Sequence, residues 1–197
     1  FRYLPLTMRQ NTREYVRDSV VAGTVTDVKF RVKGDATTIA SKDSLPGEFL
    51  ISGNVKNATF AFAPPSVAAK GAAPWPVLTQ LNGQMSFDHN SLRVTGATGV
   101  FSAGVGAAQG LQLVRAEAQI PDLHGPTTVL VSGDIRGSLD EALRVVNTSP
   151  LSAMMGDALA QAKGSGPADF RIRLNLLKRA LRHHAAAMNT SARTYVY

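Results

Sequence analysis

The segment Trp75–Phe101 constrains the fold most, because apolar and polar residues alternate along it on both sides of a turn at His89-Asn90. The apolar positions are Gly83, Met85 and Phe87 before that turn, and Leu92 and Val94 after it. Successive side chains of a strand point to opposite faces, so the alternation gives each strand one apolar and one polar face. The segment therefore predicts a β-hairpin with one apolar face and one solvated face.

The same alternation recurs along most of the chain and predicts further strands. They are expected over Val25–Lys33, Glu48–Gly53, Asn57–Ala63, Leu111–Ile120, Thr127–Ile135 and Ala168–Leu176. The second and third of these are expected to form a hairpin around Asn54. Sequential strands joined by short connections favour an antiparallel meander. A sheet of this kind must cover its apolar face, fold over on itself or leave that face for a ligand.

Helical patterns lie at the beginning and late in the chain. The first helix is expected over Thr7–Ala22, with Gly23 as its stop signal. A second is expected over Ser138–Asn147, where Ser138 and Glu141 match a capping box. Leu151–Ala162 is expected to form the partner of this second helix. The predicted fold class is mainly β, an antiparallel meander curved like an open taco or half-barrel, with one N-terminal helix and a late helical pair.

The composition narrows the possible functions. The 197 residues include no cysteine, which excludes disulfides and thiolate metal sites. The net charge is +7, and this surplus fits either a solvated basic surface or contact with anionic lipid. No run reaches the roughly 18 apolar residues that a membrane-spanning helix needs. Because the chain starts with Phe1, we interpret it as part of a longer or processed polypeptide, with any membrane anchor outside it.

No catalytic pattern interrupts the strands. His89 and His124 each lie near an aspartate but far from each other in sequence, which is weak support for a metal site. The glycines around Gly104 lack the spacing of a phosphate-binding loop, and no serine sits in a nucleophile elbow. We expect no enzyme activity, no metal and no cofactor, and no nucleic-acid partner. The apolar strand faces then remain as the candidate feature: either they form a core, or they line a groove for acyl chains.

Several short motifs, taken in order, resemble a known family. They are the W-P-x-L of Trp75–Leu78, the G-x-M-x-F of Gly83–Phe87, the L-x-V of Leu92–Val94 and the G-V-F of Gly99–Phe101. Tyr3-Leu4-Pro5, the passage from Val20 to Asp27, and Ser149-Pro150-Leu151 agree as well. Their order and spacing are similar to the YhdP-type AsmA-like proteins of Gram-negative bacteria, over roughly Arg2 to Leu177.

The resemblance implies a non-enzymatic protein anchored in the bacterial inner membrane, with a long periplasmic body built as a repeating β-groove. Such proteins are implicated in conducting phospholipid between the inner and outer membranes and in supporting the outer-membrane permeability barrier. The implied partners are phospholipid acyl chains, the membrane through an anchor outside this chain, and other envelope proteins. The alternative interpretation is a structural or scaffolding β-module that binds other envelope proteins.

The resemblance brings no catalytic residues, but it implies a lipid-facing surface. Alternation assigns to that surface Val28, Phe30, Val32, Phe60, Phe62, Met85, Phe87, Phe170, Ile172 and Leu174.

The chain divides at Leu177 in this interpretation. Residues 1–177 are expected to be one section of the β-groove domain. Residues 178–197 form a basic tail in which the alternation is lost, and we expect this tail to be aberrant or disordered. The other interpretation of the tail is an amphipathic basic helix on anionic lipid.

Overall fold

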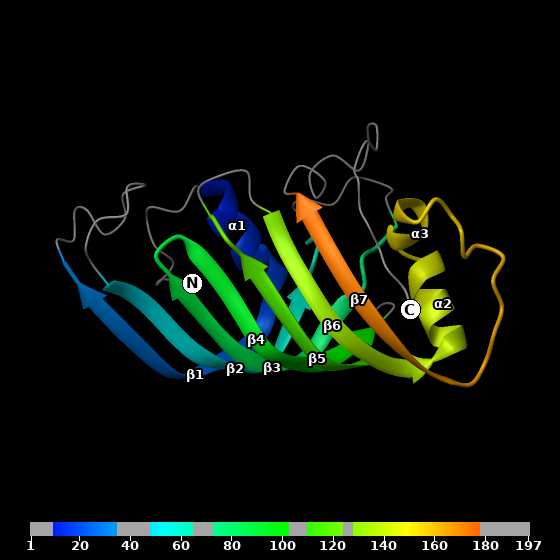
Figure 1. Cartoon of the computed structure of the whole chain (residues 1–197), viewed down its shortest axis with the longest axis horizontal. Helices are drawn as coiled ribbons and strands as arrows, with labels where there is room; N and C mark the ends of the chain where they lie inside the picture. The colour runs from blue at the N-terminus through cyan, green and yellow to red at the C-terminus, as the bar shows by residue number, and fades with distance from the viewer. Residues whose placement is uncertain (1–9, 35–47, 65–72, 103–109, 124–127, 178–197) are drawn as a thin grey trace.

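The chain folds into one antiparallel sheet in which every strand pairs with the next (Figure 1). The computed structural model describes residues 10–34, 48–64, 73–102, 110–123 and 128–177. The sheet has seven strands in the order β1 to β7. It is not closed, because within those residues β1 pairs only with β2 and β7 only with β6. The predicted open antiparallel meander is confirmed.

The strands are long for a globular protein, where five to six residues are typical. Their bounds are Val20–Lys33 (β1), Glu48–Ala61 (β2), Val77–Asp88 (β3), Ser91–Ser102 (β4), Leu111–Ile120 (β5), Thr128–Ser138 (β6) and Pro167–Leu177 (β7). The helices are α1 over Gln10–Ser19, α2 over Leu139–Asn147 and α3 over Leu151–Met154. The hairpin predicted around His89-Asn90 is β3 and β4. The late helical pair is α2 and α3, but α3 ends at Met154, well before the predicted end at Ala162.

The first helix ends earlier than its sequence pattern suggests. It stops at Ser19, and the chain continues directly into β1, so Gly23 lies within a strand and is not a helix stop. Gly23 has φ 136°, and a Cβ built on it would lie 2.6 Å from the Cβ of Ala58 in β2. The glycine is therefore required by strand pairing, because any side chain there would collide with the neighbouring strand.

Tyr15 connects α1 to the sheet. Its hydroxyl donates a 2.8 Å hydrogen bond to the backbone carbonyl of Phe62, which follows β2. Burial of the side chain raises the pKa of Tyr15.

The predicted hairpin around Asn54 is wrong, because β2 runs without a turn from Glu48 to Ala61. The Asn54 side chain donates a 2.9 Å hydrogen bond to Asp27 of β1, and this bond, together with one from Thr26, lowers the pKa of Asp27. What resembled a turn in the sequence is a bulge at Asn57, which has φ 46°. A bulge inserts one residue into a strand and interrupts the alternation without ending the pairing.

Such bulges occur in each strand from β1 to β5. In each strand, one step between successive apolar positions spans three residues instead of two. These steps are Val25 to Val28, Val55 to Ala58, Leu78 to Leu81, Val94 to Ala97 and Leu113 to Ala116. Each bulge inserts one residue and would turn the following side chains to the other face of the sheet. The three-residue step between apolar positions compensates for this, so apolar side chains stay on one face along the whole strand. By contrast, β6 pairs with β7 without any irregularity.

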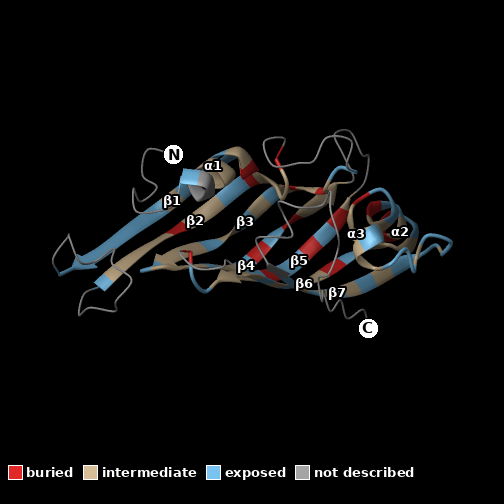
Figure 2. Cartoon of the chain, turned by 90° about the horizontal axis from the view of Figure 1, so that it is seen from above, coloured by how far each residue is buried: buried red, intermediate tan, exposed pale blue. Residues whose placement is uncertain are grey.

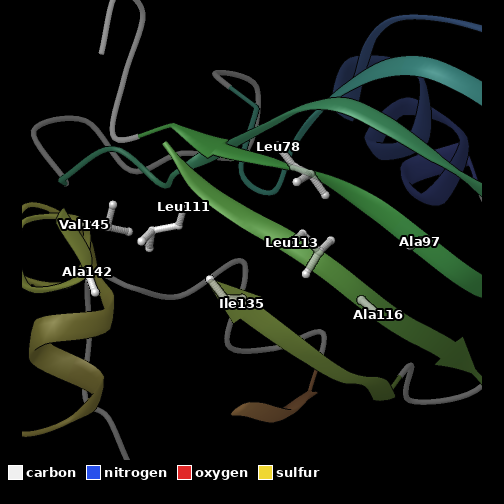
Figure 3. Close-up of a cluster of buried hydrophobic side chains, with 8 residues drawn as sticks. All are labelled: Leu78, Ala97, Leu111, Leu113, Ala116, Ile135, Ala142 and Val145. Atoms are coloured by element: carbon white, nitrogen blue, oxygen red, sulfur yellow. The ribbon is translucent and has the colours of Figure 1, made fainter. Parts of the chain in front are cut away.

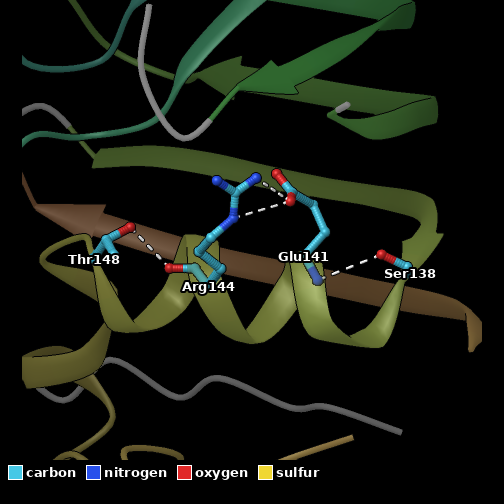
Figure 4. A network of polar contacts seen from close by, with 4 residues as sticks. All are labelled: Ser138, Glu141, Arg144 and Thr148. Atoms are coloured by element: carbon cyan, nitrogen blue, oxygen red, sulfur yellow. Dashed lines mark hydrogen bonds and ion pairs between the residues drawn. The ribbon is translucent and has the colours of Figure 1, made fainter. Parts of the chain in front are cut away.

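The strands are bowed, and α1 and α2 lie on the inner side of the curve (Figure 1). Buried residues are concentrated in the part of the sheet near α2, whereas β1 is exposed along most of its length (Figure 2). The second helix is well defined at its start, where the Ser138 hydroxyl accepts a hydrogen bond from the backbone N–H of Glu141 (Figure 4). The Glu141 carboxylate does not complete the capping box: one oxygen pairs with Arg144, and the other has no hydrogen-bond partner among the described residues.

We expect Ser138→Ala to lower the free energy of unfolding by about 1 kcal/mol, the usual cost of removing a helix N-cap. The measurement is urea unfolding followed by circular dichroism. Ser132→Ala, an exposed position on the same strand β6, is the matched control and should change stability by less than about 0.5 kcal/mol. Equal effects of the two substitutions would show that the cap does not hold α2 in place.

Candidate functional site

The strand register gathers apolar side chains from the whole sheet onto one face, which we call the apolar face. Residues paired directly across neighbouring antiparallel strands lie on the same face. One row across the sheet consists of Phe30, Ile51, Phe87, Leu92 and Ile120, from β1 to β5. A second row consists of Gly53, Met85, Val94, Ala118, Val131 and Leu174, from β2 to β7. The opposite side of the sheet is called the outer face below.

The remaining predicted residues lie on the apolar face too. A Cβ built on Gly53 would lie 3.5 Å from Val28 and 2.7 Å from Val25, so both valines stand beside the second row. Phe170 and Ile172 pair with Ile135 and Gly133, respectively. Phe62 follows the end of β2 and meets Phe60 edge-on, with ring centroids 5.2 Å apart. Every residue predicted to face lipid therefore belongs to one side of the sheet.

One end of the apolar face is packed as a core. The buried cluster consists of Leu78, Ala97, Leu111, Leu113, Ala116, Ile135, Ala142 and Val145 (Figure 3). Ala142 and Val145 come from α2, so this helix lies against the apolar face and covers part of it. Four of the predicted lipid-facing residues, Phe60, Phe62, Phe170 and Ile172, are partly buried against this cluster. At this end the apolar side chains already have partners within the protein.

The other end of the apolar face has no such cover within the described residues. Phe30 is 64% exposed, Val32 52% and Val28 45%. Met85, Phe87 and Leu174 are half-buried by their strand neighbours. Exposed apolar side chains are ordinary when scattered singly, but contiguous ones mark interaction surfaces. We call this region, formed by Val28, Phe30, Val32, Ile51, Met85, Phe87 and Leu92, the open end.

The set of residues predicted to face lipid omitted several members of the apolar face. Ile51, Leu92, Val94 and Val131 share the same rows as the predicted residues. They alternate within the same strands, so the pattern that identified Phe87 was sufficient to find them.

The outer face is polar and carries several ion pairs. Arg136 donates to Asp169 at 2.8 Å and Arg171 to Asp134 at 2.9 Å, and both pairs join β6 to β7. Asp169 raises the pKa of Arg136 through this hydrogen bond. All these side chains are more than half exposed, so water screens the pairs and they add little stability. The charged side chains keep the outer face hydrated, so one face of the sheet is charged while the other is apolar.

The described residues contain no group of histidines and acids that could hold a metal ion. His89 contacts the neighbouring Asp88 at 2.6 Å in an exposed turn, and His124 lies outside the described residues.

Comparison with protein families agrees with this geometry. The family model described as YhdP protein matches residues 1–180. The chain belongs to the YhdP family. No curated protein and no solved structure gave a match. Membership suggests an envelope protein of the lipid-transport kind, in a family regarded as transport or structural rather than enzymatic. Among the described residues of this YhdP-family chain, no helix combines the length and apolar character that crossing a membrane requires.

Replacing a side chain by alanine should affect stability differently at the packed end and at the open end of the apolar face. We expect Leu113→Ala, within the buried cluster, to lower the free energy of unfolding by about 2–5 kcal/mol. Phe30→Ala, at the open end, should cost less than about 1 kcal/mol because its ring is mostly solvated. Chemical denaturation of the two variants tests this. A loss at Phe30 as large as that at Leu113 would mean that the open end is covered in solution.

Proposed function

We propose that this chain is a non-enzymatic periplasmic section of an inner-membrane-anchored protein that conducts phospholipid between the inner and outer membranes, supporting the outer-membrane permeability barrier. The observation that supports this most directly is the open end of the apolar face. It is a patch of apolar side chains, of which Val28, Phe30 and Val32 are exposed, on a sheet whose other face is charged. The anchor would lie outside this chain.

The physics of the apolar face suits acyl chains better than a specific polar ligand. Transferring a methylene group from water to an apolar surface is worth about 0.8 kcal/mol and requires no directional contact. Phe30, Ile51 and Phe87 offer side chains of varied shape and no polar group. Such a surface holds lipid tails without distinguishing between them, and a tail can move along it without breaking hydrogen bonds.

The packed end limits where lipid would bind. Because α2 already covers the cluster around Leu111 and Leu113, acyl chains would lie on the open end, against Val28, Phe30, Val32, Met85 and Phe87. They would also contact Leu174 of β7, which lies outside the open end but in the same row as Met85. Phe60, Phe62, Phe170 and Ile172 would form the boundary between core and lipid. This narrows the lipid-facing set that alternation alone suggests.

The domain division belongs to the same proposal. Residues 1–177 form one section of a β-groove domain, whose open β1 and β7 edges suit a sheet that continues on either side. The basic tail of residues 178–197 lies outside the described residues, and its interpretation stays a prediction.

A scaffolding role is the second candidate. The same open end would then be buried against another envelope protein instead of lipid, because an exposed apolar patch fits either partner.

We expect the chain purified from a Gram-negative host to carry phospholipid, detected by native mass spectrometry and lipid extraction. Phe30→Asp/Phe87→Asp, which places two charges on the apolar face, should reduce the bound phospholipid at least tenfold. Burying an unpaired carboxylate beside acyl chains is strongly unfavourable.

The matched control is Ser86→Asp/Thr98→Asp, which adds the same charge on the outer face of β3 and β4. It should retain the lipid, and circular dichroism should show both variants folded. A folded, lipid-free wild-type chain, or equal lipid loss in both variants, would favour the scaffolding role.

A further inference from the structure

The outer face contains a hollow whose lining differs in two ways from the rest of that face. The hollow has a volume of about 410 Å³ and lies over β4, β5, β6 and β7. Leu130 lines it, although the other residues that alternate with it on this side of β6 are polar. Leu130 is 38% exposed, one of the few large apolar side chains exposed on the outer face.

The second difference is a pair of arginines that have no partner within the described ranges of the chain. Arg93 of β4 and Arg173 of β7 both line the hollow. Their neighbours Arg115, Arg136 and Arg171 are each paired with a carboxylate. Neither Arg93 nor Arg173 has an ion pair or a hydrogen bond to any residue that the structure describes. The acid within the hollow, Glu117, lies 3.5 Å from Arg115 and is thereby partly neutralised.

The spacing of the two arginines indicates the size of the ligand. Three strand steps separate β4 from β7, and Arg173 pairs one row away from the row of Arg93. The two backbones are therefore about 14 Å apart across the strands and about 7 Å along them. Leu130, which pairs with Gln119 and Asn175, lies between them in the sheet. Arginines whose backbones lie this far apart suit two side chains of an extended peptide better than one small anion.

We propose that this hollow binds an extended acidic segment of a partner protein, with carboxylate side chains at positions i and i+4 and an apolar side chain at i+2. In an extended segment these three side chains point to the same side and span about 13 Å. The two carboxylates meet Arg93 and Arg173, and the apolar side chain meets Leu130. Arginine suits carboxylates because its planar group can donate two parallel hydrogen bonds. Gln119, Ser132 and Asn175 supply further polar contacts around the rim.

The test uses the 197-residue chain and the fluorescein-labelled peptide Thr-Glu-Thr-Leu-Thr-Glu-Thr, followed by fluorescence anisotropy. We expect saturable binding that weakens with added salt. Arg93→Glu/Arg173→Glu should weaken it at least tenfold, and the peptide with glutamine in place of both glutamates should lose affinity by a similar factor. Arg93→Gln/Arg173→Gln replaces the first variant if charge reversal prevents folding.

Lys56→Glu/Lys163→Glu is the matched control, because it alters the net charge equally at two exposed positions away from the hollow. It should retain the affinity. Three outcomes would overturn the proposal: no saturable binding of the peptide, equal weakening by both double substitutions, or binding of phosphatidylglycerol vesicles that needs the two arginines while the peptide does not bind. The last outcome would assign the hollow to a membrane surface.

Discussion

The structure depends on the strand register, which keeps apolar side chains of all seven strands on one face. A shift of one residue in any strand would turn its apolar set toward the charged face. Bulges shift the phase in β1 to β5, and in each of these strands a step of three residues between apolar positions compensates. The bulges also increase local twist and bend the strands, which agrees with the bowed sheet in Figure 1. The bulges, together with the three-residue steps that compensate for them, thus account for both the curvature of the sheet and its continuous apolar face.

Packing along the apolar face is uneven, because one end is a core and the other end is exposed. Helix α2 contributes Ala142 and Val145 to the buried cluster, so the sheet has a conventional core at that end. This core anchors the fold, while Phe30 and its neighbours at the open end contribute little to it. A protein that holds lipid reversibly needs such a division, because a surface that is exchanged between water, lipid and partner cannot also be the surface that holds the fold together.

The outer face of the sheet stays in contact with water. Its ion pairs are exposed and weak individually, but they keep half of the sheet's surface hydrated. Arg136 and Arg171 are paired with carboxylates, whereas Arg93 and Arg173 have no partner in the part of the chain that the structure describes. If the apolar face takes up lipid, the outer face remains available for contacts with proteins. The two proposals therefore concern opposite sides of the same sheet and can be tested separately.

The sequence by itself determined the antiparallel meander and the shared face of the predicted lipid-facing residues, because alternation is a local property of the chain. It failed at Asn54, where an interruption of the alternation resembled a turn but was a bulge. Only the tertiary structure decided which apolar residues are core and which are open. Phe60 and Phe30 have the same pattern in sequence, yet only Phe60 packs against the cluster beneath α2. Phe60 lies opposite Leu78 of the cluster and against Phe62, whose carbonyl accepts a hydrogen bond from Tyr15 of α1. Such long-range contacts leave no trace in the local pattern of either strand.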